Sequence, residues 1–211
     1  MSRVAAYQNF RERLLSGELS PGQFVTQKEL AELAGVPIAT AREAIQKLEH
    51  ESLLKVHPQR GIQVADITTR FIREAFGLRK MLEMQAVRSF AEPGNELEVT
   101  QLMNKTMQVL ESARTSVPDE VLETAVDVDW EMHDKIIDHI DNGLLTEVYQ
   151  VNAARLRLIK VSNRMSHQRA IEALGEHMTI LEHCRNGDGN SAATALSEHI
   201  DIAMNRALQG K

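Results

Sequence analysis

The sequence predicts a mainly α-helical protein, with a winged helix-turn-helix in its N-terminal part followed by an all-α antiparallel bundle of six helices. Two short amphipathic stretches lie on either side of Gly35, which can supply the left-handed backbone of a sharp turn. Two runs of β-forming residues flank residues 58–61 and predict a hairpin. Beyond residue 67 no strand pattern is convincing, and helical stretches alternate with proline and glycine breaks.

The N-terminal part is expected to begin with a helix at about residues 4–16. The first helix of the helix-turn-helix then buries a stripe of apolar residues, Leu30, Ala31, Leu33 and Ala34. The second helix starts near Pro37, which suits a first helical turn. Its buried face consists of Ala41, Ala44, Ile45 and Leu48. A two-stranded wing then pairs residues 53–56 with residues 62–64.

The C-terminal part contains six predicted helical stretches. They fall at roughly residues 68–91, 95–114, 118–141, 144–165, 167–186 and 188–208. Short breaks between consecutive helices favour an antiparallel bundle. We therefore expect two domains, a winged helix-turn-helix at residues 1–66 and a helical bundle at residues 67–211.

The formal net charge of −6 lies in the C-terminal part of the chain. Residues 1–66 contain eight Lys and Arg against eight Asp and Glu, whereas the remainder contains sixteen against twenty-two. A neutral winged domain binds DNA weakly without sequence specificity, so we expect a homodimer on the two half-sites of a palindromic operator. The single Cys184 fits a reducing cytoplasm, no apolar run is long enough for a membrane span, and no secretory leader opens the chain.

Six of the eight histidines lie in the C-terminal part, after residue 132. Asp129 and His133 are one turn apart on one helix face, while His177 and His199 lie on two later helices. A carboxylate and three imidazoles suit Zn²⁺, and also Ni²⁺, Mn²⁺ or Fe²⁺. The spacing alone leaves the alternative of ordinary surface or core histidines, because D-x-x-x-H is a common pattern.

Motifs run through both halves of the chain in a consistent order. The front half has Leu19-Ser20-Pro21-Gly22, Leu30-Ala31-x-x-x-Gly35-Val36, Arg42-Glu43-Ala44-Ile45-x-x-Leu48 and Arg60-Gly61-x-x-Val64. The rear half has Leu78-Arg79-x-x-Leu82-Glu83, Asp129-x-x-x-His133, Glu176-His177 and His199-Ile200. In these motifs the chain resembles the FadR branch of the GntR transcription regulators over nearly its whole length. Its rear half resembles the shorter, VanR-like form of the FCD effector domain. The resemblance implies a divalent metal, Zn²⁺ foremost, held by Asp129, His133, His177 and His199 beside a small-molecule cavity.

The resemblance also implies a set of DNA-contacting residues. They are Arg42, Thr40 and Lys47 of the second, recognition helix, Lys28 of the preceding helix, and Arg60 and Gly61 at the wing tip. For the two lysines, a solvated helix face is the alternative. Family members usually carry Ser-Arg-Thr-Pro at the start of the recognition helix, where this chain has Pro37-Ile38-Ala39-Thr40. Because Ile38 can contact a thymine methyl but can read neither a guanine edge nor a phosphate, we expect A·T pairs to carry more of the specificity.

The expected function is that of a ligand-responsive transcriptional repressor whose bundle binds a small carboxylate effector. Arg79 matches a family arginine of the first bundle helix, and Asn152 and Arg155 share a face of the fourth, where an ordinary polar rim is the alternative. A metal-dependent enzyme is a rival interpretation, since such ligand sets also serve oxygen chemistry. No nucleophile–base pair or phosphate loop supports it, and no enzyme is expected. A third interpretation makes the metal purely structural.

Overall fold

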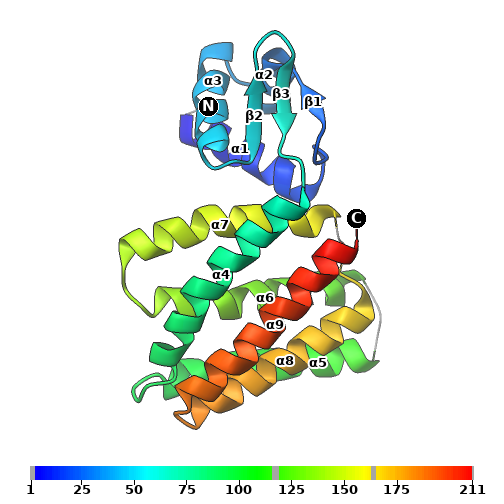
Figure 1. Ribbon diagram of the computed structural model, residues 1–211. Coiled ribbons are helices and arrows are strands. Elements are labelled where there is room, and N and C mark those ends of the chain that lie inside the picture. Colours follow the sequence, from blue (N-terminus) through cyan, green and yellow to red (C-terminus); the bar gives the residue numbers. More distant parts are fainter. Residues whose placement is uncertain (1–2, 116–118, 163–164, 211) are drawn as a thin grey trace. The chain divides into compact units, whose positions relative to one another are not determined.

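The computed structural model describes residues 3–115, 119–162 and 165–210, in which nine helices and three strands are found (Figure 1). The chain divides into two compact units. The first consists of Met1–Ala75, Gln150–Arg164 and Ala207–Lys211, and the second of Phe76–Tyr149 and Met165–Arg206. The predicted fold class is confirmed. The predicted boundary between residues 66 and 67 stays a prediction, because the units group residues by contact rather than by order along the chain.

The first unit contains the predicted helix-turn-helix. Helix α1 (Arg3–Ser16) packs on α3 (Ile38–His50), and α2 (Gln27–Ala34) packs on both. Thr26 and Glu29 form a capping box at the start of α2, and Gly35 ends it with a φ of 61°. The predicted buried face of α3 is confirmed. The prediction for α2 is wrong at Leu33, which is 39% exposed, because only Leu30, Ala31 and Ala34 of this short helix face the core.

The wing is a three-stranded antiparallel sheet of order β1-β3-β2, formed by β1 (Phe24–Val25), β2 (Leu54–His57) and β3 (Gly61–Val64). The predicted hairpin is confirmed, although Leu53 lies outside its strands and His57 and Gly61 extend them, so that Leu54 pairs with Val64 and His57 with Gly61. The sequence does not predict β1, since two residues are too short to show a strand pattern. Gly61 is required here, because its φ is 102° and a Cβ would lie 2.9 Å from the carbonyl oxygen of Val25.

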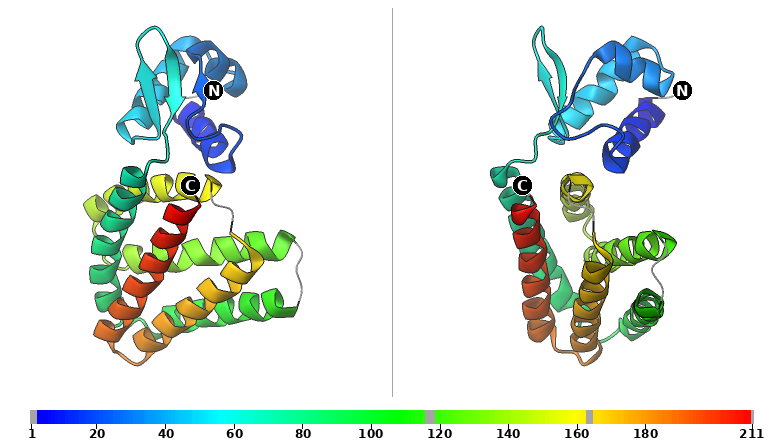
Figure 2. Two further views of the ribbon diagram at one scale, coloured as in Figure 1. Left: turned by 45° about the vertical axis from the view of Figure 1, so that its right-hand side comes forward. Right: turned by 90° about the vertical axis from the view of Figure 1, so that its right-hand side faces the viewer.

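The six predicted helices of the C-terminal part are confirmed within a few residues. They are α4 (Thr69–Phe90), α5 (Glu96–Thr115), α6 (Asp119–Asp138), α7 (Gly143–Ser162), α8 (His167–Arg185) and α9 (Gly189–Gln209). In the second unit α5, α6 and α8 pack on one another. Helices α4 and α9 lie side by side (Figure 2), joined by the ion pair of Lys80 and Asp201 at 2.7 Å. Among the described residues, no helix combines the length and apolarity needed to cross a membrane.

Candidate metal centre and nucleic-acid interface

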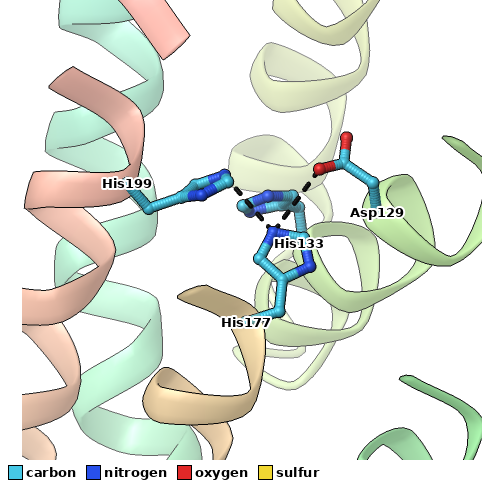
Figure 3. Close-up of side chains that lie close together, drawn as sticks. All are labelled: Asp129, His133, His177 and His199. Atoms are coloured by element: carbon cyan, nitrogen blue, oxygen red, sulfur yellow. Dashed lines mark hydrogen bonds and ion pairs between the residues drawn. The ribbon is translucent and has the colours of Figure 1, made fainter. Parts of the chain in front are cut away.

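Three helices of the second unit bring the predicted metal ligands together (Figure 3). Helix α6 supplies Asp129 and His133, which point to the same side because they are one turn apart, while α8 supplies His177 and α9 supplies His199. All four side chains are buried. Each offers one nitrogen or oxygen atom, and these atoms lie within 4.8 Å of one another. The family resemblance implies this convergence, whereas spacing along the sequence leaves it open.

The spacing of the ligand atoms fits a small divalent ion. The Nε2 atom of His177 is 3.3 Å from Nε2 of His199 and 3.4 Å from Oδ1 of Asp129. Bonds of about 2.0–2.1 Å at tetrahedral angles put neighbouring ligand atoms roughly 3.3 Å apart. Burial lowers the pKa of His177 well below its ordinary value, assisted by the neighbouring His199. The imidazole is therefore neutral, as metal binding requires.

Two of the three imidazoles contact a carboxylate on the side away from the cluster. Nδ1 of His133 lies 2.7 Å from Oε2 of Glu83, and Nδ1 of His199 lies 2.6 Å from Oε2 of Glu176. Nδ1 of His177 is buried and has no hydrogen-bond partner among the described residues. The rings of His133 and His199 are therefore each oriented by a carboxylate outside the cluster, whereas His177 has no such partner among the described residues.

Each of these two carboxylates is held by an arginine. Arg79 donates from Nε to Oε1 of Glu83 at 2.8 Å, with both side chains buried. Arg169 donates from both terminal nitrogens to the two oxygens of Glu176, at 2.5 and 2.8 Å. Burial raises the pKa of Glu83, and Arg79 opposes this rise. Burial also acts to raise the pKa of Glu176, but hydrogen bonds from Arg169 and His199 outweigh it and lower this pKa to about 2.

The carboxylates of Glu83 and Glu176 are functional candidates to which sequence reasoning gives no role. Glu83 and Glu176 belong to motifs of the resemblance, but neither motif says which side chain the carboxylate contacts. Glu83 is fifty residues before His133 in the chain, so only the tertiary structure reveals their contact. A weak sequence signal exists for Glu83, since Arg79 precedes it by one helical turn.

The structure separates the three predicted effector residues into different surroundings. Arg79 is in the second unit, where its Nη2 is buried without a hydrogen-bond partner among the described residues. Asn152 and Arg155 are in the first unit. Asn152 donates to the carbonyl oxygen of Ala75 at 2.9 Å, and Arg155 donates from Nε to that of Glu51 at 2.9 Å. Their effector role stays a prediction.

A groove of about 410 Å³ separates the recognition helix α3 from the wing. Arg42 lines it from α3 and Gly61 from β3, so the structure brings these two predicted residues together. The other predicted DNA contacts, Thr40, Lys28, Lys47 and Arg60, do not line the groove. Lys47 lies over the ring of Tyr7, 3.9 Å from its centroid, and Lys28 pairs with Glu32 at 3.6 Å. Arg42 is exposed, as the burial of its neighbours on α3 predicts.

Both parts of the chain match known families. Residues 3–64 match the gntR family of bacterial regulatory proteins, and residues 74–202 match the FCD domain. The transcriptional regulator YdhC of Bacillus subtilis is 23% identical over 195 residues, which cover 92% of this chain and 86% of YdhC. The transcriptional repressor RspR of Escherichia coli is also 23% identical over 195 residues, covering 92% of this chain and 83% of RspR.

Solved structures share the fold. The structure of Escherichia coli McbR/YncC matches with a TM-score of 0.76 and 21% identity, over 98% of this chain and 97% of that one. A Zn²⁺-bound FCD domain of the regulator TM0439 matches with a TM-score of 0.52 and 19% identity, over 69% of this chain and 96% of that one. The matches on both domains exclude the interpretation as a metal-dependent enzyme. The chain belongs to the GntR family of bacterial transcription regulators that carry an FCD domain, and it is a DNA-binding regulator.

Proposed function

We propose that this regulator is a homodimeric, cytoplasmic repressor of a palindromic operator, controlled by a small carboxylate that binds beside a divalent metal ion. The observation that carries the proposal is the buried cluster of Asp129, His133, His177 and His199. The related RspR is a transcriptional repressor, which supports a repressor here, and the Zn²⁺-bound FCD domain of TM0439 supports Zn²⁺ as the first choice of metal, ahead of Ni²⁺, Mn²⁺ or Fe²⁺.

The charges around the cluster favour a cation. Three carboxyl groups, those of Glu83, Asp129 and Glu176, face two guanidinium groups, those of Arg79 and Arg169. Buried charge of one sign is costly unless it is neutralised. When bound, the metal supplies an electrophilic centre that accepts a carboxylate oxygen in a coordination position that the protein leaves open. The four protein ligands leave such positions only if the coordination number exceeds four.

Arg79 is the residue best suited to hold the effector within this unit. Its Nε is committed to Glu83, while Nη2 is buried and has no hydrogen-bond partner among the described residues. A carboxylate accepts a charge-assisted bond from such a group. The ring of Trp130 lies 5.7 Å from the guanidinium carbon and can pack against the body of an organic acid. Asn152 and Arg155 remain predicted effector contacts.

For the operator we propose that Arg42 reads bases and that the wing tip contacts the neighbouring groove or backbone. Arg42 and the wing line one groove, so a duplex that meets one also meets the other. The two winged domains of a homodimer then bind two half-sites. Lys28, Thr40, Lys47 and Arg60 are secondary candidates for phosphate contacts.

Selection from random duplex DNA followed by fluorescence anisotropy tests this function. The selected sites should share a palindrome. With Zn²⁺ supplied, at least one acid from a panel of small carboxylic acids should change the operator Kd at least fivefold, and this response should be lost in Arg79→Lys. Selection without a common sequence would overturn the operator proposal. If a chelator lowers the melting temperature but no acid raises it or alters DNA binding, the metal is structural.

A further inference from the structure

We infer that Glu176, held by Arg169, is a positioning residue that turns the Nε2 lone pair of His199 toward the metal position. We infer also that in the metal-free protein this fixes His177 in the opposite tautomer. The inference rests on the proposed metal site for its purpose, but its statement about the metal-free protein does not depend on metal binding. Glu83 has the corresponding role for His133.

The contact of Glu176 with His199 sets the position of one proton. A neutral imidazole has one N–H donor and one acceptor nitrogen, and a carboxylate is acceptor-only. Both oxygens of Glu176 accept hydrogen bonds from Arg169, as a carboxylate does, and Oε2 also lies 2.6 Å from Nδ1 of His199. Nδ1 therefore carries the proton, and Nε2 of His199 carries the lone pair that a metal needs.

The orientation of Glu176 is itself fixed. Arg169 lies two turns earlier on α8 and binds both carboxylate oxygens, at 2.5 and 2.8 Å. A bidentate pair of this kind holds the plane of the carboxylate as well as its position. On α4 the pair of Arg79 and Glu83 holds the carboxylate that faces Nδ1 of His133 at 2.7 Å.

His177 follows from His199 by exclusion. Their Nε2 atoms are 3.3 Å apart, and two acceptor nitrogens do not form a hydrogen bond. Because Nε2 of His199 is the acceptor, Nε2 of His177 must carry the proton, and Oδ1 of Asp129 at 3.4 Å is a second acceptor for it. Nδ1 of His177 is buried and has no hydrogen-bond partner among the described residues. The absence of an acceptor there agrees with a nitrogen that carries no proton.

Metal binding then requires His177 alone to exchange tautomers. Its proton leaves Nε2, so that this nitrogen can act as a ligand, and a proton is taken up at Nδ1, so the imidazole stays neutral. His133 and His199 keep their Nδ1 protons throughout. Of the three histidines, His177 is therefore the one whose protonation differs between the two states.

Nitrogen-15 NMR of the histidines tests the inference directly. The full chain, labelled at histidine nitrogen, is stripped of metal by a chelator and measured at pH 8, above the ordinary histidine pKa of about 6.5. Long-range proton–nitrogen spectra distinguish the two tautomers. We expect Nδ1–H for His133 and His199 and Nε2–H for His177, with His177 changing to Nδ1–H after addition of Zn²⁺. If His177 and His199 show the same tautomer in the metal-free protein, the inference is wrong.

A matched pair of variants tests the role of the carboxylate. Glu176→Gln should loosen Zn²⁺ about 10–100-fold in competition with a chromophoric chelator, and should disturb the His199 tautomer. The control is Glu172→Gln on the same helix, since Glu172 pairs with Arg206 at 2.8 Å and lies 3.9 Å from Arg169. It should change neither readout, and an equal loss in both variants would overturn the role. For Glu83, the control is Glu74→Gln, which breaks the exposed pair with Arg70 at the same spacing.

The failure of this inference is distinguishable from failure of the proposed function. If the unmodified protein binds no Zn²⁺, the metal proposal fails, while the tautomers of the metal-free protein are still measured and judged. If Zn²⁺ binds and the tautomers are not those expected, the metal site stands and the positioning role falls.

Discussion

Replacement of His177 by alanine tests the metal site most directly. The imidazole is fully buried, and its Nε2 lies 3.3 and 3.4 Å from atoms of two other proposed ligands, so the substitution removes one of the four proposed ligand atoms. The variant should lose bound metal. A ligand present at 100 times its Kd stabilises a protein by about 2.7 kcal/mol. At roughly 2–4 °C for each kcal/mol in a chain of this size, the metal-dependent rise in Tm is about 5–11 °C.

The assay compares each protein with itself, stripped and reloaded. Differential scanning fluorimetry gives the metal-dependent change in Tm, which removes the cost of the cavity that alanine leaves in both states. Elemental analysis gives the metal content. His183→Ala is the control, since His183 lies six residues later on α8, about 240° around the helix, and is outside the cluster. Full occupancy in His177→Ala, or equal loss in both variants, would refute the ligand assignment.

Further predictions concern the winged unit. Arg42→Ala should weaken operator binding by about 1–3 kcal/mol in anisotropy at fixed salt, and unchanged affinity in a folded variant would refute base contact. Because Ile38 is 51% exposed at the start of α3, selection should recover A·T-rich half-sites, and a guanine-rich site read through residues 37–40 would contradict this. Burial and the hydrogen bond to Glu51 raise the pKa of Tyr7 from 10.0 to about 12. The raised pKa adds to the free energy of unfolding, and this contribution is fully present below pH 10 and is lost as the pH rises through 12. Because Tyr7 is partly exposed, solvent screening reduces this contribution to about 1 kcal/mol. When unfolding is measured at increasing pH, Tyr7→Phe should therefore lose about 1 kcal/mol less stability between pH 10 and 12 than the unmodified protein, and identical alkaline profiles would exclude the contribution.

The helices could be predicted because residues that break helices separate them in the sequence. Proline and glycine breaks and 3.6-residue apolar periods gave the six C-terminal helices within a few residues of the observed bounds, except that α7 ends at Ser162 and the following two residues lie outside the described part. The wing hairpin was predictable from turn residues. Strand β1 was not, because its two residues pair with β3 through tertiary contact rather than through any periodicity.

The cluster of proposed metal ligands could also be predicted in part, for a different reason. Asp129 and His133 share a helix face by spacing alone, so the sequence can nominate them together. Placing His177 and His199 beside them needed the family resemblance, because spacing does not determine which faces of separate helices meet. The supporting carboxylates could not be assigned, since Glu83 is identified by a 2.7 Å contact with a residue fifty positions away.

The two proposed ligands of the bundle meet at one side chain. Arg79 uses Nε to hold Glu83, which in turn contacts His133, while its Nη2 is the group proposed to bind the effector carboxylate. A carboxylate at Nη2 would therefore bind the same guanidinium that holds Glu83, and through Glu83 would affect the orientation of His133, a proposed metal ligand. Binding free energies are reciprocally linked, so an effector that tightens Zn²⁺ by some factor must itself be tightened by Zn²⁺ by the same factor. Calorimetric titration of each ligand in the presence and absence of the other measures both factors. Independent binding would mean that the carboxylate is held away from Arg79.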